Sequence, residues 1–157
     1  ILRFLWTCVL GPPASKVQLL MRLRIYAQNK NSVWLLRWCS DRLQKFGIFI
    51  HPEARIGHGT KLPHPTGIVI GKGVVVEDHV RIFQNVTLGG ARMGDYENNR
   101  YPKIGSGTTI FAGAVIVGDL EIGPDCTIGA NSVVLHDVPK GSVAVGAPAR
   151  NSRLNKS

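Results

Sequence analysis

Aliphatic residues recur at every sixth position over most of the chain beyond residue 50. The thirteen positions form three strict runs: Ile50, Ile56 and Leu62; Ile70, Val76, Ile82 and Leu88; and Ile104, Ile110, Ile116, Ile122, Ile128 and Val134. Neither an α-helix nor a hairpin sheet has a period of six. The pattern predicts an all-β solenoid, in which each hexad is a short strand with an inward aliphatic side chain followed by a tight turn. At three hexads per coil, the runs make about four coils.

Two interruptions break the period of six. Leu62 and Ile70 are eight residues apart, so two extra residues are inserted around the string PHPTG. Leu88 and Ile104 are sixteen residues apart, which predicts a projecting loop over residues 89–103. Irregularities in repeat proteins are often loops on the functional face, although each could be a tolerated surface insertion. Because both interruptions flank the same coils, we favour a functional site.

The chain divides into a basic leader and a nearly neutral repeat domain. Its 157 residues carry a net charge of +9. Residues 1–46 account for +7, with eight Lys and Arg residues against one acid, and the rest of the chain for +2. The charge therefore belongs to the leader, which argues against a nucleic-acid-binding domain. We expect an α-helical leader over residues 1–46, the repeat domain over residues 47–150 and a tail over residues 151–157.

The leader shows helical periodicity in two segments. A helix capped by Ser15 would place one apolar set on a common face: Leu19, Leu20, Leu23, Tyr26 and Ala27. A second helix, from Asn31 or Ser32 to Gly47, would do the same for Leu35, Trp38, Cys39, Leu43 and Phe46. We expect both helices to pack on the repeat domain or on a neighbouring subunit.

An alternative role for residues 1–46 is peripheral contact with an anionic membrane surface, because basic residues alternate there with tryptophans. The apolar run ILRFLWTCVL is about half of the ~20 residues that a membrane span needs. We interpret it as an ordered or interfacial segment, with the remnant of a signal sequence as the alternative. The expected location is the cytoplasm, or the inner face of the membrane.

Histidine and cysteine positions restrict the chemistry. The three cysteines form no CxxC pair, and the five histidines form no converging set, so no metal is expected. His64 stands out because it lies in the first interruption between two prolines, whose rings restrict the backbone. An imidazole can accept a hydroxyl proton at neutral pH, so His64 is our candidate general base. A histidine in a loop is, taken alone, more often structural than catalytic.

The strings HPTGIVIG, VTLGG and GAPAR lie within residues 50–150. With the hexads, they resemble the serine acetyltransferase branch of the hexapeptide-repeat acyltransferases, and most closely the short surface-polysaccharide O-acetyltransferases of the colanic acid and capsule type. The resemblance implies a left-handed parallel β-helix with a short N-terminal helical segment. It also implies a homotrimer with active sites between neighbouring subunits, and acetyl-CoA as co-substrate.

Site residues follow from the resemblance position by position. His64 matches the catalytic base of the family. Gly90 matches a glycine beside the pantetheine arm, and Ala112 and Ala130 match small residues that line the cofactor groove. Arg150, in the GAPAR string, would meet a CoA phosphate.

Three positions depart from the serine-specific pattern. Phe49 stands where the family has an aspartate paired with the catalytic histidine, and Pro63 where an aspartate helps to hold serine. Tyr101 replaces a second substrate-contacting histidine. A zwitterionic amino acid needs charged partners, so these losses point to a neutral polyhydroxy acceptor. Arg100 and Tyr101 would bind it, with Tyr101 stacking on or hydrogen-bonding to a sugar ring.

We therefore expect an acetyl-CoA-dependent O-acetyltransferase that acts on a sugar hydroxyl of a surface polysaccharide or of its lipid-linked glycan precursor. The first alternative is a serine O-acetyltransferase of cysteine biosynthesis, and the second is a non-catalytic solenoid scaffold. Without the family's aspartate, a backbone carbonyl, Glu53 or Glu77 would orient His64.

Overall fold

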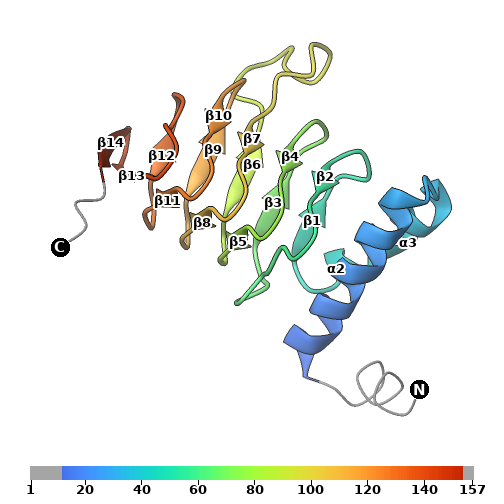
Figure 1. Ribbon diagram of the computed structural model, residues 1–157. Coiled ribbons are helices and arrows are strands. Elements are labelled where there is room, and N and C mark those ends of the chain that lie inside the picture. The colour runs from blue at the N-terminus through green and yellow to red at the C-terminus, as the bar shows by residue number, and fades with distance from the viewer. Residues whose placement is uncertain (1–11, 154–157) are drawn as a thin grey trace.

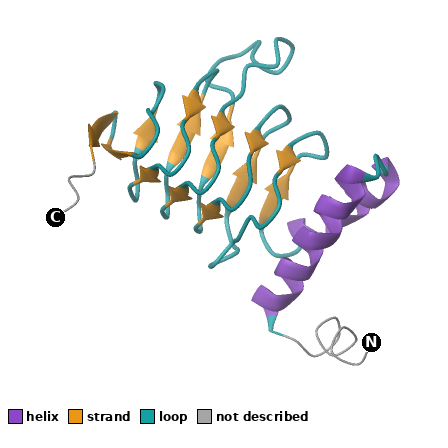
Figure 2. Ribbon diagram, in the orientation of Figure 1, coloured by secondary structure: helices purple, strands orange, loops and turns teal. Residues whose placement is uncertain are grey.

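The computed structural model describes residues 12–153, which form two helices followed by a coiled stack of short strands (Figures 1 and 2). Helix α2 comprises Pro13–Asn29 and helix α3 comprises Val33–Gln44. Both helices lie at one end of the stack beside the first strands, and the last described strands lie at the other end (Figure 1). The apolar run at residues 1–10 falls outside the described residues.

Three parallel sheets form the sides of the stack. Sheet A contains β1 (Ile48–Ile50), β3 (Ile68–Ile70), β6 (Thr87–Gly89), β9 (Val115–Val117) and β12 (Val133–Val134). Sheet B contains β2 (Arg55–Ile56), β4 (Val75–Val76), β7 (Lys103–Ile104) and β10 (Glu121–Ile122). Sheet C contains β5 (Arg81–Ile82), β8 (Thr109–Ile110), β11 (Thr127–Ile128) and β13 (Ser142–Gly146), with β14 (Ala149–Arg153) added antiparallel to β13. The chain visits sheets A, B and C in turn, so the expected parallel β-helix is confirmed.

The hexad aliphatics form the core of the β-helix. All thirteen are at most 5% exposed. They stack in register from coil to coil, as Ile70 does beneath Leu88 and Leu88 beneath Ile116 in sheet A. Each buried side chain of this size contributes about 1.5–3 kcal/mol relative to an exposed one.

The stack has five coils, one more than the count of hexads predicts, because sheet A contains five strands. The last coil runs through β12, a bridge between Ile122 and Val138, and β13. Its buried residues Val134, Val138 and Ala144 are spaced by four and then by six positions, so the coil departs from the strict period.

The helices form near their expected positions, but α2 turns a different face inward. It begins at Pro13 with Pro12 as its N-cap, not at Ser15. Its buried residues are Val17, Met21, Arg24 and Ala27, whereas Tyr26 of the expected face is 56% exposed. Helix α3 has Ser32 as its N-cap and buries Cys39 and Leu43 of the expected set.

Helix α2 covers the open edge of the first coil through side-chain hydrogen bonds. Arg24 Nη2 donates to the carbonyl oxygens of His51 (2.8 Å) and Ala54 (2.9 Å). The amide of Gln28 pairs with the backbone of Ile56 in both directions, at 3.0 and 3.3 Å. Because no earlier coil precedes this edge, the helix supplies the partners that a strand would. Burial lowers the pKa of Arg24 to about 10, so it remains charged at neutral pH.

Candidate active site

His64 lies in the turn that joins sheet C of the first coil to β3, where the period of six is first interrupted. Its side chain is exposed, and its ring centroid lies 5.8 Å from that of Phe83. Thr66 N donates to the carbonyl oxygen of His64 (2.9 Å), which closes the turn.

We call the edge formed by the turns from sheet C to sheet A the C–A corner; it comprises residues 63–67, 83–86, 111–114 and 129–132. The same backbone geometry recurs along it, because the left-handed Asn85 (φ 58°) and Asn131 (φ 55°) donate to the carbonyls of Thr66 and Ala112 respectively. Ala112 is half-buried and Ala130 is exposed. The structure therefore brings His64, Ala112 and Ala130 onto one edge of the molecule.

A second group of predicted residues lies on another edge. We call the edge formed by the turns from sheet A to sheet B the A–B corner; the loop over residues 89–103 projects from it (Figure 1). Gly90, Arg100 and Tyr101 all belong to this loop, so the single chain does not bring them beside His64. The two interruptions leave from different corners, although they flank the same coils.

Tyr101 is covered by its own subunit. Its side chain is 8% exposed, and its ring lies over the backbone of Gly71 and Gly73, where an added Cβ at Gly71 would be 3.0 Å from the ring carbon Cε1. Burial raises the pKa of Tyr101. The ring is thus unavailable as a stacking platform within one chain, and a substrate role for Tyr101 stays a prediction. Arg100 is exposed.

Asp95 holds the loop over residues 89–103 in shape. Its Oδ2 accepts hydrogen bonds from the backbone N–H groups of Ala91 (2.7 Å) and Arg92 (2.8 Å), and Asp95 O accepts one from Arg100 N (3.0 Å). Lys72 Nζ of the second coil lies 4.3 Å from the centroid of the Tyr96 ring, which ties the loop to the β-helix. Beside the loop is a cavity of about 490 Å³ whose lining includes Arg92, Arg100 and His136.

Removing the Asp95 carboxylate is expected to loosen this loop. The hydrogen bonds from Arg92 and Ala91 hold the pKa of Asp95 below its usual value. A carboxyl group of this kind stabilises the loop above its ordinary pKa, and the contribution is lost as the pH falls through the lowered pKa. In Asp95→Ala, hydrogen exchange of the Ala91 and Arg92 amides should be faster at neutral pH. Glu97→Ala, an exposed carboxylate on the same loop, is the control; equal protection in both variants would contradict the assignment.

Arg150 lies far along the chain from the other predicted residues, on β14 opposite Val145. Its side chain is exposed at the C-terminal end of sheet C. The CoA-phosphate role of Arg150 therefore stays a prediction, as does the pantetheine role of Gly90.

Neither carboxylate expected to orient His64 contacts it. Glu77 Oε2 accepts hydrogen bonds from the backbone and hydroxyl of Ser106, at 2.9 and 2.8 Å. Glu53 Oε2 lies 3.9 Å from Lys72 Nζ on the A–B corner. Both groups are engaged at other corners, so within one chain neither of them orients His64, and orientation by a backbone carbonyl stays a prediction. Phe49 points outward from sheet A and is 41% exposed.

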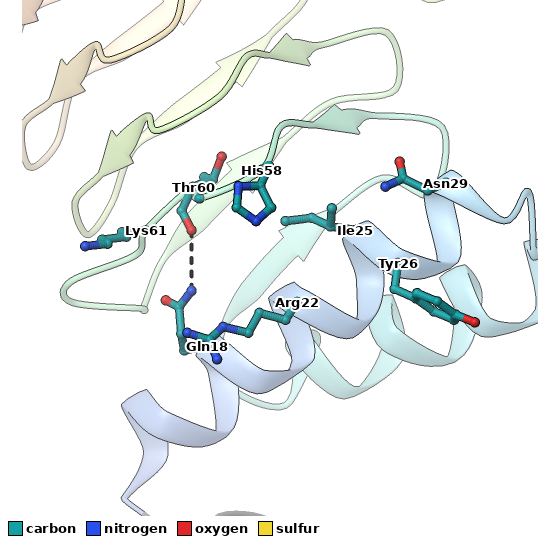
Figure 3. Close-up of a pocket in the computed structure, with 9 residues that line it drawn as sticks. Gln18, Arg22, Ile25, Tyr26, Asn29, His58, Thr60 and Lys61 are labelled. Carbon is teal, nitrogen blue, oxygen red and sulfur yellow. Dashed lines mark hydrogen bonds between the residues drawn. The ribbon is translucent and has the colours of Figure 1, made fainter. Parts of the chain in front are cut away.

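A cavity of about 520 Å³ lies between α2 and the first coil, away from the predicted site (Figure 3). His58 and Arg22 point into the space between helix and coil, and Gln18 Nε2 donates to Thr60 O at 3.5 Å (Figure 3). No pattern in the sequence predicts this cavity, because it depends on how α2 docks against the first coil. Within residues 12–153, no group of three or more His, Cys, Asp or Glu side chains could hold a metal ion.

Comparisons with known proteins give a consistent result. Residues 101–136 match the family model described as bacterial transferase hexapeptide (six repeats). The chain is 45% identical over 130 residues to a serine acetyltransferase of Haemophilus influenzae, covering 82% of this chain and 48% of that protein. It is 40% identical over 147 residues to the serine acetyltransferase of Helicobacter pylori, covering 92% of this chain and 84% of that protein. The chain spans about half the length of the first of these relatives.

Solved structures agree with the sequence relatives. A serine acetyltransferase in complex with CoA superposes with a TM-score of 0.76 at 40% identity, covering 94% of this chain and 60% of that one. Soybean serine acetyltransferase complexed with serine superposes with a TM-score of 0.78 at 38% identity, covering 93% of this chain and 60% of that one. These likenesses confirm the left-handed parallel β-helix with its N-terminal helical segment.

The comparisons also correct two expectations. The relatives are named serine acetyltransferase, so the surface-polysaccharide resemblance and the sugar acceptor inferred from it are wrong. The substitutions at Phe49, Pro63 and Tyr101 do not place the chain outside the family, because its identity to the named enzymes is 40–47%. None of the names of these relatives and solved structures refers to a membrane, so membrane contact by residues 1–46 is unsupported. Among the described helices, none has the length and apolar character of a membrane span.

Proposed function

Because this chain belongs to the serine acetyltransferase family of the hexapeptide-repeat acyltransferases, we propose that it transfers the acetyl group of acetyl-CoA to the hydroxyl of serine, a step of cysteine biosynthesis. The observation that carries the proposal is the 40% identity that extends over 84% of the Helicobacter pylori enzyme. A relative solved with CoA and one solved with serine support the two substrates. The donor requires a compartment that holds acetyl-CoA, so a cytoplasmic location is part of the proposal.

In the proposed reaction, His64 acts as the general base. Its imidazole accepts the hydroxyl proton of serine while the oxygen attacks the thioester carbonyl. The carbon–sulfur bond then breaks, and the imidazolium returns the proton to the departing CoA thiolate. Ala112 and Ala130 support this role, because small side chains on the corner of His64 leave room for the pantetheine arm.

Serine binding requires a partner for the carboxylate. Arg100 supplies an exposed guanidinium, and such a group binds a carboxylate in a bidentate manner. Arg100 lies on the A–B corner, whereas His64 lies on the C–A corner, so one chain cannot present both to one substrate. The proposed assembly is therefore a homotrimer, in which the A–B corner of one subunit meets the C–A corner of the next.

The outward face of sheet A supports this assembly. The side chains that face outward in successive strands are paired in the order Phe49, Val69, Thr87, Val115 and Val133. The side chain of Phe49 is 41% exposed and that of Val69 is 40% exposed. Sheet B by contrast presents charged residues, among them Arg55 and Glu121. Sheet A also lies between the two corners that a trimer would bring together.

An acceptor panel tests the proposed function. The protein is incubated with acetyl-CoA and serine, threonine or a set of hexoses, while free thiol is followed and products are identified by mass spectrometry. We expect thiol release with serine and formation of O-acetylserine, with little turnover of threonine because its extra methyl crowds the reacting oxygen. Thiol release with hexoses but not with serine would overturn the proposal. Absence of both thiol release and CoA binding would favour the scaffold.

A further inference from the structure

The His64 side chain is held by aromatic contact. Within residues 12–153, the side chain of His64 takes part in no hydrogen bond or ion pair, and Phe49 occupies the position where the family's aspartate is expected. A general base must nevertheless present one ring nitrogen to the acceptor hydroxyl in a defined geometry. What touches the imidazole therefore determines how well it is aligned.

Two phenylalanines continue from His64 along the C–A corner. The ring of Phe83 lies 5.8 Å from the imidazole, centroid to centroid, at an interplanar angle of 52°. On its other side it stacks on Phe111 at 5.2 Å and 23°. The three rings thus form a row across three successive coils, with Phe83 in the middle.

The backbone beneath this row is fixed by the β-helix. Phe83 N donates to Ile110 O (3.0 Å), and Phe111 N donates to Ile128 O (2.9 Å). Each phenylalanine directly follows a fully buried hexad aliphatic, Ile82 or Ile110. Phe83 is half-buried between its neighbours. The row is therefore anchored in a rigid part of the fold, although the turn that carries His64 is exposed.

We propose that Phe83, supported by Phe111, is a positioning residue for the His64 imidazole and restricts its ring orientation in the role that a carboxylate serves elsewhere in the family. This inference rests on the proposed function, because it takes His64 as the base. An aromatic ring limits rotation of the imidazole without occupying either ring nitrogen by a hydrogen bond. Both nitrogens stay available, one to the acceptor hydroxyl and the other to water.

Substitutions at Phe83 test the proposal. Phe83→Ala should lower kcat about tenfold, because the base loses its alignment, while KM for acetyl-CoA and serine changes less than twofold. Phe83→Tyr keeps the ring and should retain most of the activity, and Phe111→Ala should give a smaller loss of kcat. Tyr26→Ala, which removes an exposed ring on α2, is the matched control and should have no effect. Phe83→Leu, which keeps apolar bulk without a ring, should also lower kcat and serves if Phe83→Ala does not fold.

A double-mutant cycle separates positioning from a merely structural role. In the His64→Ala background, adding Phe83→Ala should leave the residual rate unchanged, since the group through which Phe83 acts is gone. An equal fall in both backgrounds would overturn the proposal, as would full kcat in Phe83→Ala or Phe83→Leu. Failure of the proposed function would look different, because serine turnover would be absent from the unmodified protein or untouched by His64→Ala.

Discussion

Replacing His64 with alanine is expected to lower kcat for serine acetylation about 100-fold or more. A positioned general base contributes about 10²–10⁴-fold to such a reaction, and alanine leaves only water to accept the hydroxyl proton. KM for acetyl-CoA should stay near its unmodified value, because the pantetheine arm is expected to lie along Ala112 and Ala130. The measurement is steady-state thiol release at saturating acetyl-CoA and serine.

The matched control for this variant is His58→Ala. His58 is also exposed in a turn of the first coil, but it lines the cavity beside α2 and should leave kcat unchanged. Thermal unfolding of both variants checks that the fold is retained. Full activity in His64→Ala would show that another group takes the proton, and the catalytic assignment would then be wrong.

Replacing Arg24 with methionine is expected to lower the free energy of unfolding by about 2–3 kcal/mol, because a hydrogen bond to a charged group is worth about that much and the carbonyls of His51 and Ala54 lose their donor. Methionine retains much of the side-chain volume, so the cavity contribution is small. The midpoint of thermal unfolding should fall by about 4–10 °C. Arg24 is fully buried, so water does not replace the hydrogen bonds that the variant loses.

Arg22→Met on the same helix is the control for Arg24. Arg22 is exposed and two residues away, so its replacement should change the unfolding midpoint little. Arg24→Lys adds a second test, since a single ammonium cannot reach both carbonyls with the geometry of a guanidinium fork and should stabilise less than arginine. If Arg24→Met and Arg22→Met unfold at the same temperature, the hydrogen bonds to the first coil contribute nothing measurable.

The β-helix could be predicted because its signal is local and repeated. Each hexad buries one aliphatic side chain and turns at the next few residues, so the period of six appears directly in the sequence. The fifth coil was missed where Val134, Val138 and Ala144 depart from this spacing. The inward face of α2 was misassigned because an arginine forms part of it. Hydrophobic periodicity predicts which apolar side chains are buried. It does not predict burial of a guanidinium that donates hydrogen bonds to backbone carbonyls.

The residues proposed for the site come from the sequence one by one, whereas their arrangement on the edges of the β-helix comes only from the structure. The resemblance proposes His64, Ala112 and Ala130 as site residues. Counting hexads in threes would also have placed the two interruptions on different corners, since one follows the third side of a coil and the other the first. Phe83 and Phe111 also had a signal, because both directly follow a hexad aliphatic of sheet C. Their equivalent positions show that the two rings stack only when the coils are arranged one above the other.

The period of six by itself determined that this chain forms a β-helix, because every sixth side chain must be buried for short strands to stack. It also located the two interruptions at which a site could form. Only the tertiary structure decided which residues share an edge, since neighbours across coils are set by backbone hydrogen bonds between segments about 16–28 residues apart in sequence. Contacts such as those of His64 with Phe83, and of Arg24 with the first coil, follow from that stacking.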